Sequence, residues 1–297
     1  MNFKEFDPSI GVEGYCNAIR DILFPNSSPT TLDIAALELN YRIYVKGSIF
    51  SRVRPIEDSF VEKFRKEPVT RKEFFPAARS IKEASQGRFN AQGERKLYLA
   101  DHPYVALKEC GIEPGQHFLF SYFCFNTDTY FLDAEPNKTK FSKILHALFQ
   151  SGDRRFYEVI NKVYDSYLDY PEFQGIAYSS ARVPKKHYDI AWGEIESTTN
   201  LAMKEDHMPS ADFLGGWLAV CDEEYRPRKL RIFIPSNPKK KEKLVATAYL
   251  GSKSKFISLT NELIQRIQRI KNKSITRIKE KGYADPEMKP MKFSIKD

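Results

Sequence analysis

The chain has 297 residues, of which 41% are hydrophobic and 29% are charged, so it is long and apolar enough to build a globular core. It has no apolar run of the roughly 18 residues that cross a bilayer, which excludes a membrane-spanning helix. The formal net charge of +8 comes from one segment, because residues 239–282 contain 13 Lys and Arg against 3 Glu. The rest of the chain is slightly acidic. The positive net charge therefore gives little information about a functional site outside residues 239–282.

The first residues, MNFKEFDPSI, are acidic where a signal peptide is basic, and no apolar run follows them, so we expect a cytoplasmic protein. The cysteines show neither a CxxC pair nor a zinc-type spacing, and we therefore expect no disulfide framework and no metal site. These cysteines are Cys16, Cys110, Cys124 and Cys221.

Apolar residues at helical spacing predict two helices near the N-terminus, over residues 12–24 and 31–44, with the turn-forming PNSSPT between them. Alternating apolar and polar side chains predict a strand over 47–55. The polar stretch 57–86 indicates an irregular connection with room for a short helix.

A short strand is predicted over residues 96–100, with Tyr98 on the face opposite its two leucines. The following helix, 102–110, begins after Asp101 as a candidate N-cap and ends at Gly111. Further along the chain, aromatic or apolar runs predict strands and amphipathic runs predict helices. The expected strands are 117–125, 129–134, 174–180, 215–221 and 229–235, and the expected helices are 141–150 and 154–168.

The last predicted element is a basic amphipathic helix over residues 253–281, and the residues after Pro286 read as a poorly ordered end. Helices and mostly short strands thus alternate irregularly, which predicts the α+β class. We expect a helical N-terminal extension over 1–46, a catalytic domain over 47–238 and a basic helical tail over 239–297.

The common dinucleotide, phosphate-loop, zinc-protease and serine-hydrolase motifs are absent from the sequence. Four other short motifs follow one another instead. They are GRFN at 87–90 with Gly93, LYLA at 97–100, ALKE at 106–109, and YSS at 178–180 followed by Ala181-Arg182.

In order and spacing these motifs resemble the RES-domain family, which takes its name from an Arg, a Glu and a Ser. The resemblance covers about residues 48–205 and implies an ADP-ribosyltransferase-like mixed sheet with flanking helices. It also implies a toxin of a toxin-antitoxin system, which degrades NAD or transfers ADP-ribose and is neutralised by a separate antitoxin protein. NAD would be a substrate, and no metal is implied.

The residue types suit cleavage of the bond between nicotinamide and ribose, which builds positive charge on the sugar. Glu109 is the candidate counter-charge, Arg88 is a candidate diphosphate ligand, Tyr98 is a candidate stacking ring, and Ser180 is a candidate hydrogen-bonding group. Residues that we expect to help bind NAD are Arg52, Arg54, Phe89, Asn90 and Ser179.

Several alternatives stay open at this point. Ser179 stands where the family often has Pro and competes with Ser180, and Arg52 competes with Arg54 as the family's first-strand arginine. Glu194 and Glu196 resemble the paired glutamates of arginine-directed ADP-ribosyltransferases, although a solvated strand face gives the same pattern.

The function we expect first is an NAD glycohydrolase or phosphorylase, followed by a protein ADP-ribosyltransferase with the same site. The third alternative is a non-catalytic module that binds nucleic acid or a protein partner through the basic helix. For that helix we favour docking on the body over nucleic-acid binding, and the two terminal segments also suit a homodimer contact.

Overall fold

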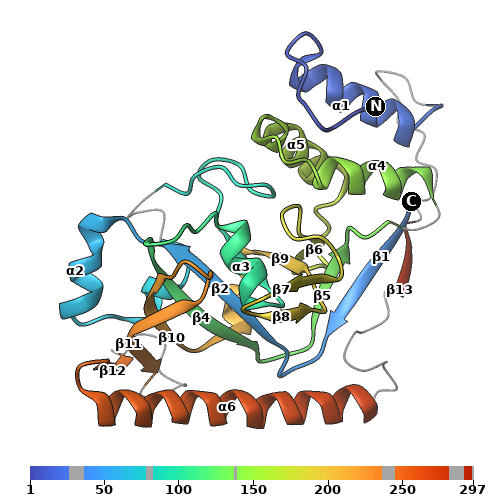
Figure 1. Ribbon diagram of the computed structural model, residues 1–297. Helices are drawn as coiled ribbons and strands as arrows, with labels where there is room; N and C mark the ends of the chain where they lie inside the picture. Colours follow the sequence, from blue (N-terminus) through green and yellow to red (C-terminus); the bar gives the residue numbers. More distant parts are fainter. Residues whose placement is uncertain (27–36, 78–82, 137–138, 236–244, 281–290, 296–297) are drawn as a thin grey trace.

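The computed structural model describes residues 1–26, 37–77, 83–136, 139–235, 245–280 and 291–295 (Figure 1). In this part of the chain one bent sheet is covered by helices at opposite ends. The α-helices are α1 (Gly11–Leu23), α2 (Asp58–Lys66), α3 (Pro103–Glu109), α4 (Lys140–Phe149), α5 (Tyr157–Tyr167) and α6 (Lys253–Glu280). Short 3-10 helices are η1 (Arg71–Phe74), η2 (Arg154–Phe156) and η3 (Glu205–Ser210).

The sheet has eleven strands in the described residues, in the order β12-β11-β10-β4-β2-β3-β9-β6-β5-β1-β13. Every neighbouring pair is antiparallel except β5 and β6, so the expected α+β class is confirmed. The strands of this sheet are β1 (Leu37–Tyr44), β2 (Ile49–Pro55), β3 (Lys96–Ala100), β4 (His117–Phe125), β5 (Thr129–Asp133), β6 (Gly175–Ser179), β9 (Thr199–Lys204), β10 (Ala211–Cys221), β11 (Pro227–Pro235), β12 (Val245–Tyr249) and β13 (Met291–Ile295).

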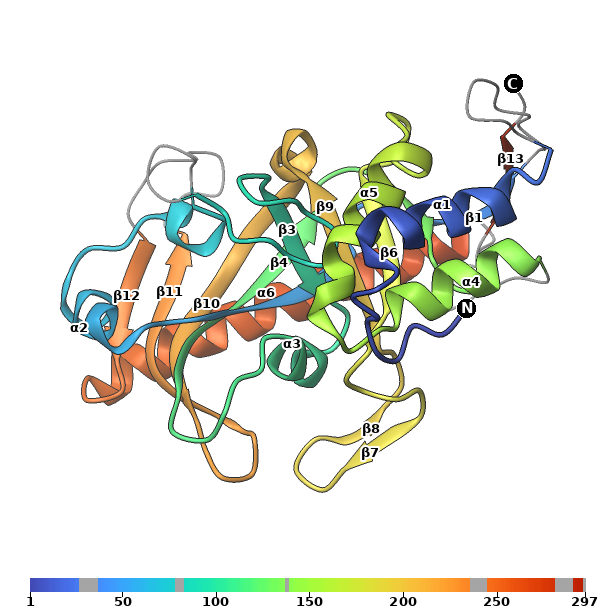
Figure 2. The same cartoon turned by 90° about the horizontal axis from the view of Figure 1, so that it is seen from above.

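A separate hairpin, β7 (His187–Asp189) with β8 (Gly193–Ile195), projects away from this sheet (Figure 2). Its tip is exposed, since Tyr188 is 71% and Ile190 is 93% accessible to solvent. The hairpin is held to α3 at its base, where the rings of Tyr104 and His187 stack at 5.4 Å.

The sheet bends between β2 and β3, which share the residue pair Ser51 and Ala100. The two halves on either side of this bend face each other across an aromatic core. The ring of Phe125 on β4 stacks on Phe131 of β5 at 5.8 Å, and Phe50 of β2 contacts Tyr44 of β1 at 5.0 Å. Burial of these rings is what holds the two halves together.

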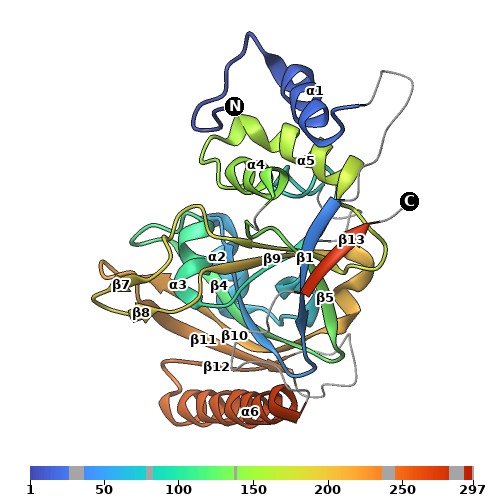
Figure 3. The same cartoon turned by 90° about the vertical axis from the view of Figure 1, so that its right-hand side faces the viewer.

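Helices α1, α4 and α5 gather at one end of the molecule and α6 runs along the other (Figures 1 and 3). No helix in the described part of the chain combines the length and the apolar character needed to cross a membrane. The N-terminal segment is tied to the loop after α4, because the Phe6 amide donates to Asp153 at 3.0 Å.

The sequence located most of these elements, but the predicted second helix over 31–44 is wrong for residues 37–44. Residues 31–36 of that helix lie outside the described part. Residues 37–44 form β1, which pairs with β5 in the main sheet, and its Arg42 forms an ion pair with Asp133 at 3.0 Å. These tertiary contacts outweigh the local helical periodicity.

Two smaller expectations also change. The cap of α3 is His102, whose ring nitrogen accepts from the Tyr104 amide at 3.2 Å, and not Asp101. Part of the end after Pro286 is strand β13, which pairs with β1. The sheet therefore takes β1 from the expected N-terminal extension and β12 and β13 from the expected tail.

Candidate active site

The GRFN motif forms a tight loop that is closed by Tyr98 of β3. The Tyr98 hydroxyl accepts from the Phe89 amide at 3.0 Å and donates to Asn90 Oδ1 at 2.8 Å. Glycine is needed at position 87, since a Cβ there would lie 2.3 Å from Asn90 Oδ1 and 2.8 Å from the Tyr98 hydroxyl. Burial raises the pKa of Tyr98, so it acts here as a neutral hydrogen-bonding group.

Arg88 extends from this loop into a buried position, where it is 6% exposed. Its guanidinium donates to the carbonyls of Phe149, at 2.8 Å, and Ser151, at 3.4 Å. The guanidinium carbon also lies 5.7 Å from the ring centroid of Tyr157 and 5.8 Å from that of Tyr178. Two aromatic rings and two carbonyls thus occupy this guanidinium, so Arg88 does not present the open pair of donors expected of a diphosphate ligand.

Glu109 and Ser180 are in direct contact. Ser180, which follows directly after β6, donates to Glu109 Oε1 at 2.5 Å, and the Ala181 amide donates to the same oxygen at 3.2 Å. The Ser180 hydroxyl in turn accepts from the amides of Arg182 and Val183, at 3.1 and 2.9 Å. The half-buried carboxylate is therefore held by one oxygen, and Oε2 accepts no hydrogen bond within the described part of the chain.

Tyr178 joins the two halves of this site. Burial raises the pKa of the Tyr178 hydroxyl well above its usual value, and the nearby charge of Glu109 raises it further. Burial alone would lower the pKa of Arg88, but the neighbouring Tyr178 and Glu109 outweigh it and raise that pKa. Arg88 thus lies beside the Tyr178 ring, Glu109 and Tyr98 act on the Tyr178 pKa, and Ser180 is linked to Glu109 by its hydrogen bond.

Ser179 belongs to a second carboxylate that the sequence reasoning missed. Its hydroxyl donates to Glu135, which also receives a hydrogen bond from Lys185 at 2.5 Å. Although burial would raise the pKa of Glu135, these two bonds hold it below its usual value. Glu135 follows β5, and the parallel pairing of β5 with β6 brings it to Ser179; no local pattern in the sequence signals that pairing.

Four expected binding residues have structural partners instead. Phe89 is fully buried against Phe149 and Tyr178, so it has no face for a nicotinamide ring, and Asn90 donates to three carbonyls of its own loop. Arg52 and Arg54 donate to the η1 carbonyls of Phe74 and Glu73 at 3.0 and 2.6 Å, rather than joining Arg88. Burial, with the charge of Arg54, lowers the pKa of Arg52 to about 10.

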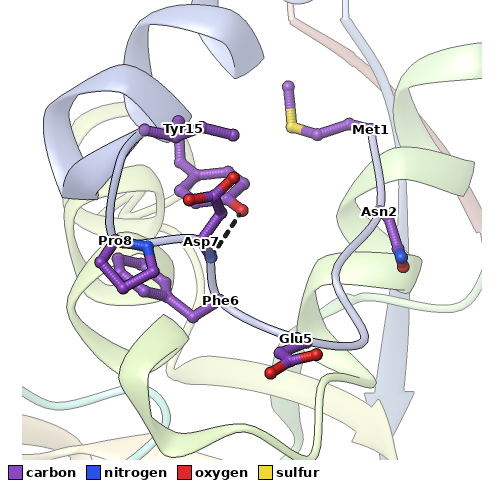
Figure 4. A pocket seen from close by; sticks show the side chains of 8 residues that line it. Met1, Asn2, Glu5, Phe6, Asp7, Pro8 and Tyr15 are labelled. Carbon is purple, nitrogen blue, oxygen red and sulfur yellow. Dashed lines mark hydrogen bonds between the residues drawn. The ribbon is translucent and has the colours of Figure 1, made fainter.

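Two surface hollows lie beside the N-terminal segment. One is enclosed by that segment and α1, with Asp7 donating through its amide to the Tyr15 hydroxyl at 3.2 Å (Figure 4). The other lies between residues 1–4 and the end of α4, including Gln150 and Ser151. It adjoins the site, because Ser151 accepts from Arg88 and Gln150 donates to the Ser179 carbonyl at 2.7 Å.

Comparison of the chain with protein-family models, with curated proteins and with solved structures finds no match. A carboxylate with one oxygen held by two hydrogen bonds, whose charge also acts on the buried Arg88 and Tyr178, is suited to stabilising a cation that develops on a bound substrate.

Proposed function

We propose that the protein cleaves NAD at the bond between nicotinamide and ribose. This reaction would deplete NAD in the cell that produces the protein. The observation that carries this proposal is the hydrogen bond from Ser180 to Glu109, which holds in place a carboxylate whose charge raises the pKa of the buried Tyr178. Two contacts between the four RES-type motifs support it, namely the hydrogen bond from Ser180 to Glu109 and the hydrogen bonds of Tyr98 to Phe89 and Asn90.

The main requirement of this reaction is a negative charge that is held close to the ribose carbon from which nicotinamide leaves. As nicotinamide leaves, the ribose becomes oxocarbenium-like, and Glu109 Oε2 stabilises it either directly or by accepting from a ribose hydroxyl. Ser180 and the Ala181 amide keep the carboxylate in position, so that reorganisation costs little during the reaction. Arg88 supplies positive potential for the diphosphate, and Tyr157 offers a half-buried ring beside it.

The fold supports the same proposal at a coarser level. A mostly antiparallel sheet that bends between β2 and β3 fits an ADP-ribosyltransferase-like core, with the site formed on β3, α3 and β6. The expected role as a toxin with a separate antitoxin protein is part of this proposal, since uncontrolled NAD loss would have to be restrained in the producing cell.

The test is to incubate the purified full chain with NAD and to measure nicotinamide by chromatography. The proposal predicts nicotinamide and an ADP-ribose product in equal amounts. Heat-denatured protein is the control, and a folded, native preparation that leaves NAD intact in the presence of water, phosphate and cell extract would refute the proposal.

The products of the same incubation show which acceptor receives the ADP-ribose. Free ADP-ribose indicates water, ADP-ribose 1″-phosphate formed only with phosphate present indicates phosphorolysis, and labelled NAD that marks a protein band indicates ADP-ribosyl transfer. Glu194 and Glu196 are both exposed on β8 and the residue after it, in a position open to a protein acceptor. Their replacement by Gln would then lower labelling without lowering nicotinamide release.

A further inference from the structure

Helix α6 lies along one side of the molecule with one face buried and the other open (Figures 1 and 3). The buried face packs on β10, β11 and β12 through Phe256 and Leu263, which are 7% and 0% exposed. Leu263 lies directly over Gly215, where a Cβ would come within 2.8 Å of it.

The second half of α6 is held as well. Ser274 is 5% exposed and packs against Gly47, and Arg277 donates to the Lys46 carbonyl at 2.8 Å. Arg266 donates to the Leu214 carbonyl at 3.4 Å. Because contacts of this kind occur from Phe256 to Arg277, the outer face of the helix has a fixed orientation.

The outermost line of α6 consists of uncharged side chains that donate and accept hydrogen bonds. Successive members are three or four residues apart, so they form one stripe along the helix, and every member is exposed. The members of this polar stripe are Ser254, Ser258, Asn261, Gln265, Gln268, Asn272 and Thr276.

Exposed cations flank the polar stripe on both sides. At 100° per residue, Lys253 and Lys271 fall on one side, and Lys255, Arg269 and Lys273 on the other. Between residues 253 and 277 the sequence has one acidic residue, Glu262, and Arg266 pairs with it at 3.0 Å. The charge of the helix is therefore arranged as two positive edges around a neutral centre.

We propose that this face of α6 binds duplex DNA, with the polar stripe in the major groove and the flanking cations on the two phosphate backbones. Amide side chains match the donor and acceptor pattern of base edges there, and Lys and Arg neutralise phosphates. From Ser254 to Thr276 the stripe is about 33 Å long, so a straight helix would reach base edges of the winding groove with part of the stripe at a time. Docking on the body and binding DNA use opposite faces of the helix, so the first does not exclude the second.

Other polyanions fit this surface less well. The major groove of an RNA duplex is too deep and narrow for a docked helix. A bilayer surface selects a helix with an apolar outer face, whereas the exposed Ile257 and Ile264 lie to one side of the polar stripe.

The test uses the full chain and a fluorescently labelled duplex of mixed sequence, with binding followed by anisotropy. If five phosphates are neutralised, affinity falls about 500-fold between 50 and 200 mM salt. A charge variant, with Gln replacing Lys253, Lys255, Arg269, Lys271 and Lys273, is expected to bind at least about tenfold more weakly. Its matched control removes five other exposed cations, through Gln at Lys4, Lys66, Lys140, Lys143 and Arg154.

A second variant tests the polar stripe itself, with Ala at Asn261, Gln265, Gln268 and Asn272. It is expected to lose affinity for the DNA duplex and to bind heparin as the unaltered chain does, while circular dichroism shows the same helix content. The proposal is overturned if the charge variant binds DNA like its control or if the stripe variant keeps full DNA affinity. Equal or tighter binding to duplex RNA or to phosphatidylserine vesicles also overturns it, and no arm of the test depends on NAD turnover.

Discussion

Two neighbouring serines at the end of β6 serve two different carboxylates. Ser180 donates to Glu109 and also accepts from two main-chain amides, whereas Ser179 donates to Glu135. The sequence alone left these serines as alternatives. Their hydrogen bonds assign Ser180 to the carboxylate of the proposed reaction and Ser179 to the one beside it.

Ser180→Ala should therefore lower nicotinamide release more than Ser179→Ala. It frees Glu109 to move and leaves two amides of the 180–183 turn without a side-chain acceptor, which costs about 1–3 kcal/mol of stability. Steady-state kinetics and thermal unfolding of both variants give the comparison. Equal turnover in the two variants would contradict the assignment.

Glu135 gives a prediction about acid stability. Its pKa is lowered in the folded chain, so its contribution is present above the unfolded pKa of about 4.3 and is lost as pH falls through the lower folded value. Glu135→Gln should lower the melting temperature at pH 7 and have less effect as pH falls below about 4. A melting difference that does not change with pH would show that the Glu135 charge is not stabilising.

At the scale of elements, the packing of α6 on the sheet requires a close contact between Leu263 and Gly215. Gly215 has a φ of +152°, and a Cβ there would meet Leu263 at 2.8 Å and the Phe233 carbonyl at 3.1 Å. Gly215→Ala should thus destabilise the chain by about 1–3 kcal/mol. Gly152→Ala is the matched control, since its Cβ meets nothing within 4 Å; similar melting temperatures for the two variants would contradict the packing.

Elements with their own periodicity could be predicted from the sequence, and those fixed by distant partners could not. The strand β3 and the helices α3, α5 and α6 follow from local patterns. The apolar residues of segment 37–44 are compatible with a helix, but apolar and polar residues also alternate there. Pairing with β5 stabilises the strand. The compact motif is what led to the prediction of Arg88, Tyr98 and Glu109, whereas Glu135 and Tyr157 come beside Ser179 and Arg88 through tertiary contacts that no local pattern signals.

At the scale of the whole molecule, the two halves of the sheet are joined by their aromatic core. Phe131 is 0% exposed and stacks on Phe125 across the core, while its neighbour Tyr130 is 39% exposed. Phe131→Ala should cost about 3–5 kcal/mol, and Tyr130→Ala much less. Chemical unfolding checks this, and a small loss for Phe131→Ala would mean that the halves are held together elsewhere.

The most direct test of the account is the rate of nicotinamide release by Glu109→Gln. Gln keeps the size of the side chain and removes the charge, so turnover should fall about 10²- to 10³-fold. The exposed Glu113, replaced by Gln, is the matched control and should leave turnover unchanged. Near-normal NAD turnover by folded Glu109→Gln protein would contradict the central claim that this carboxylate carries the reaction.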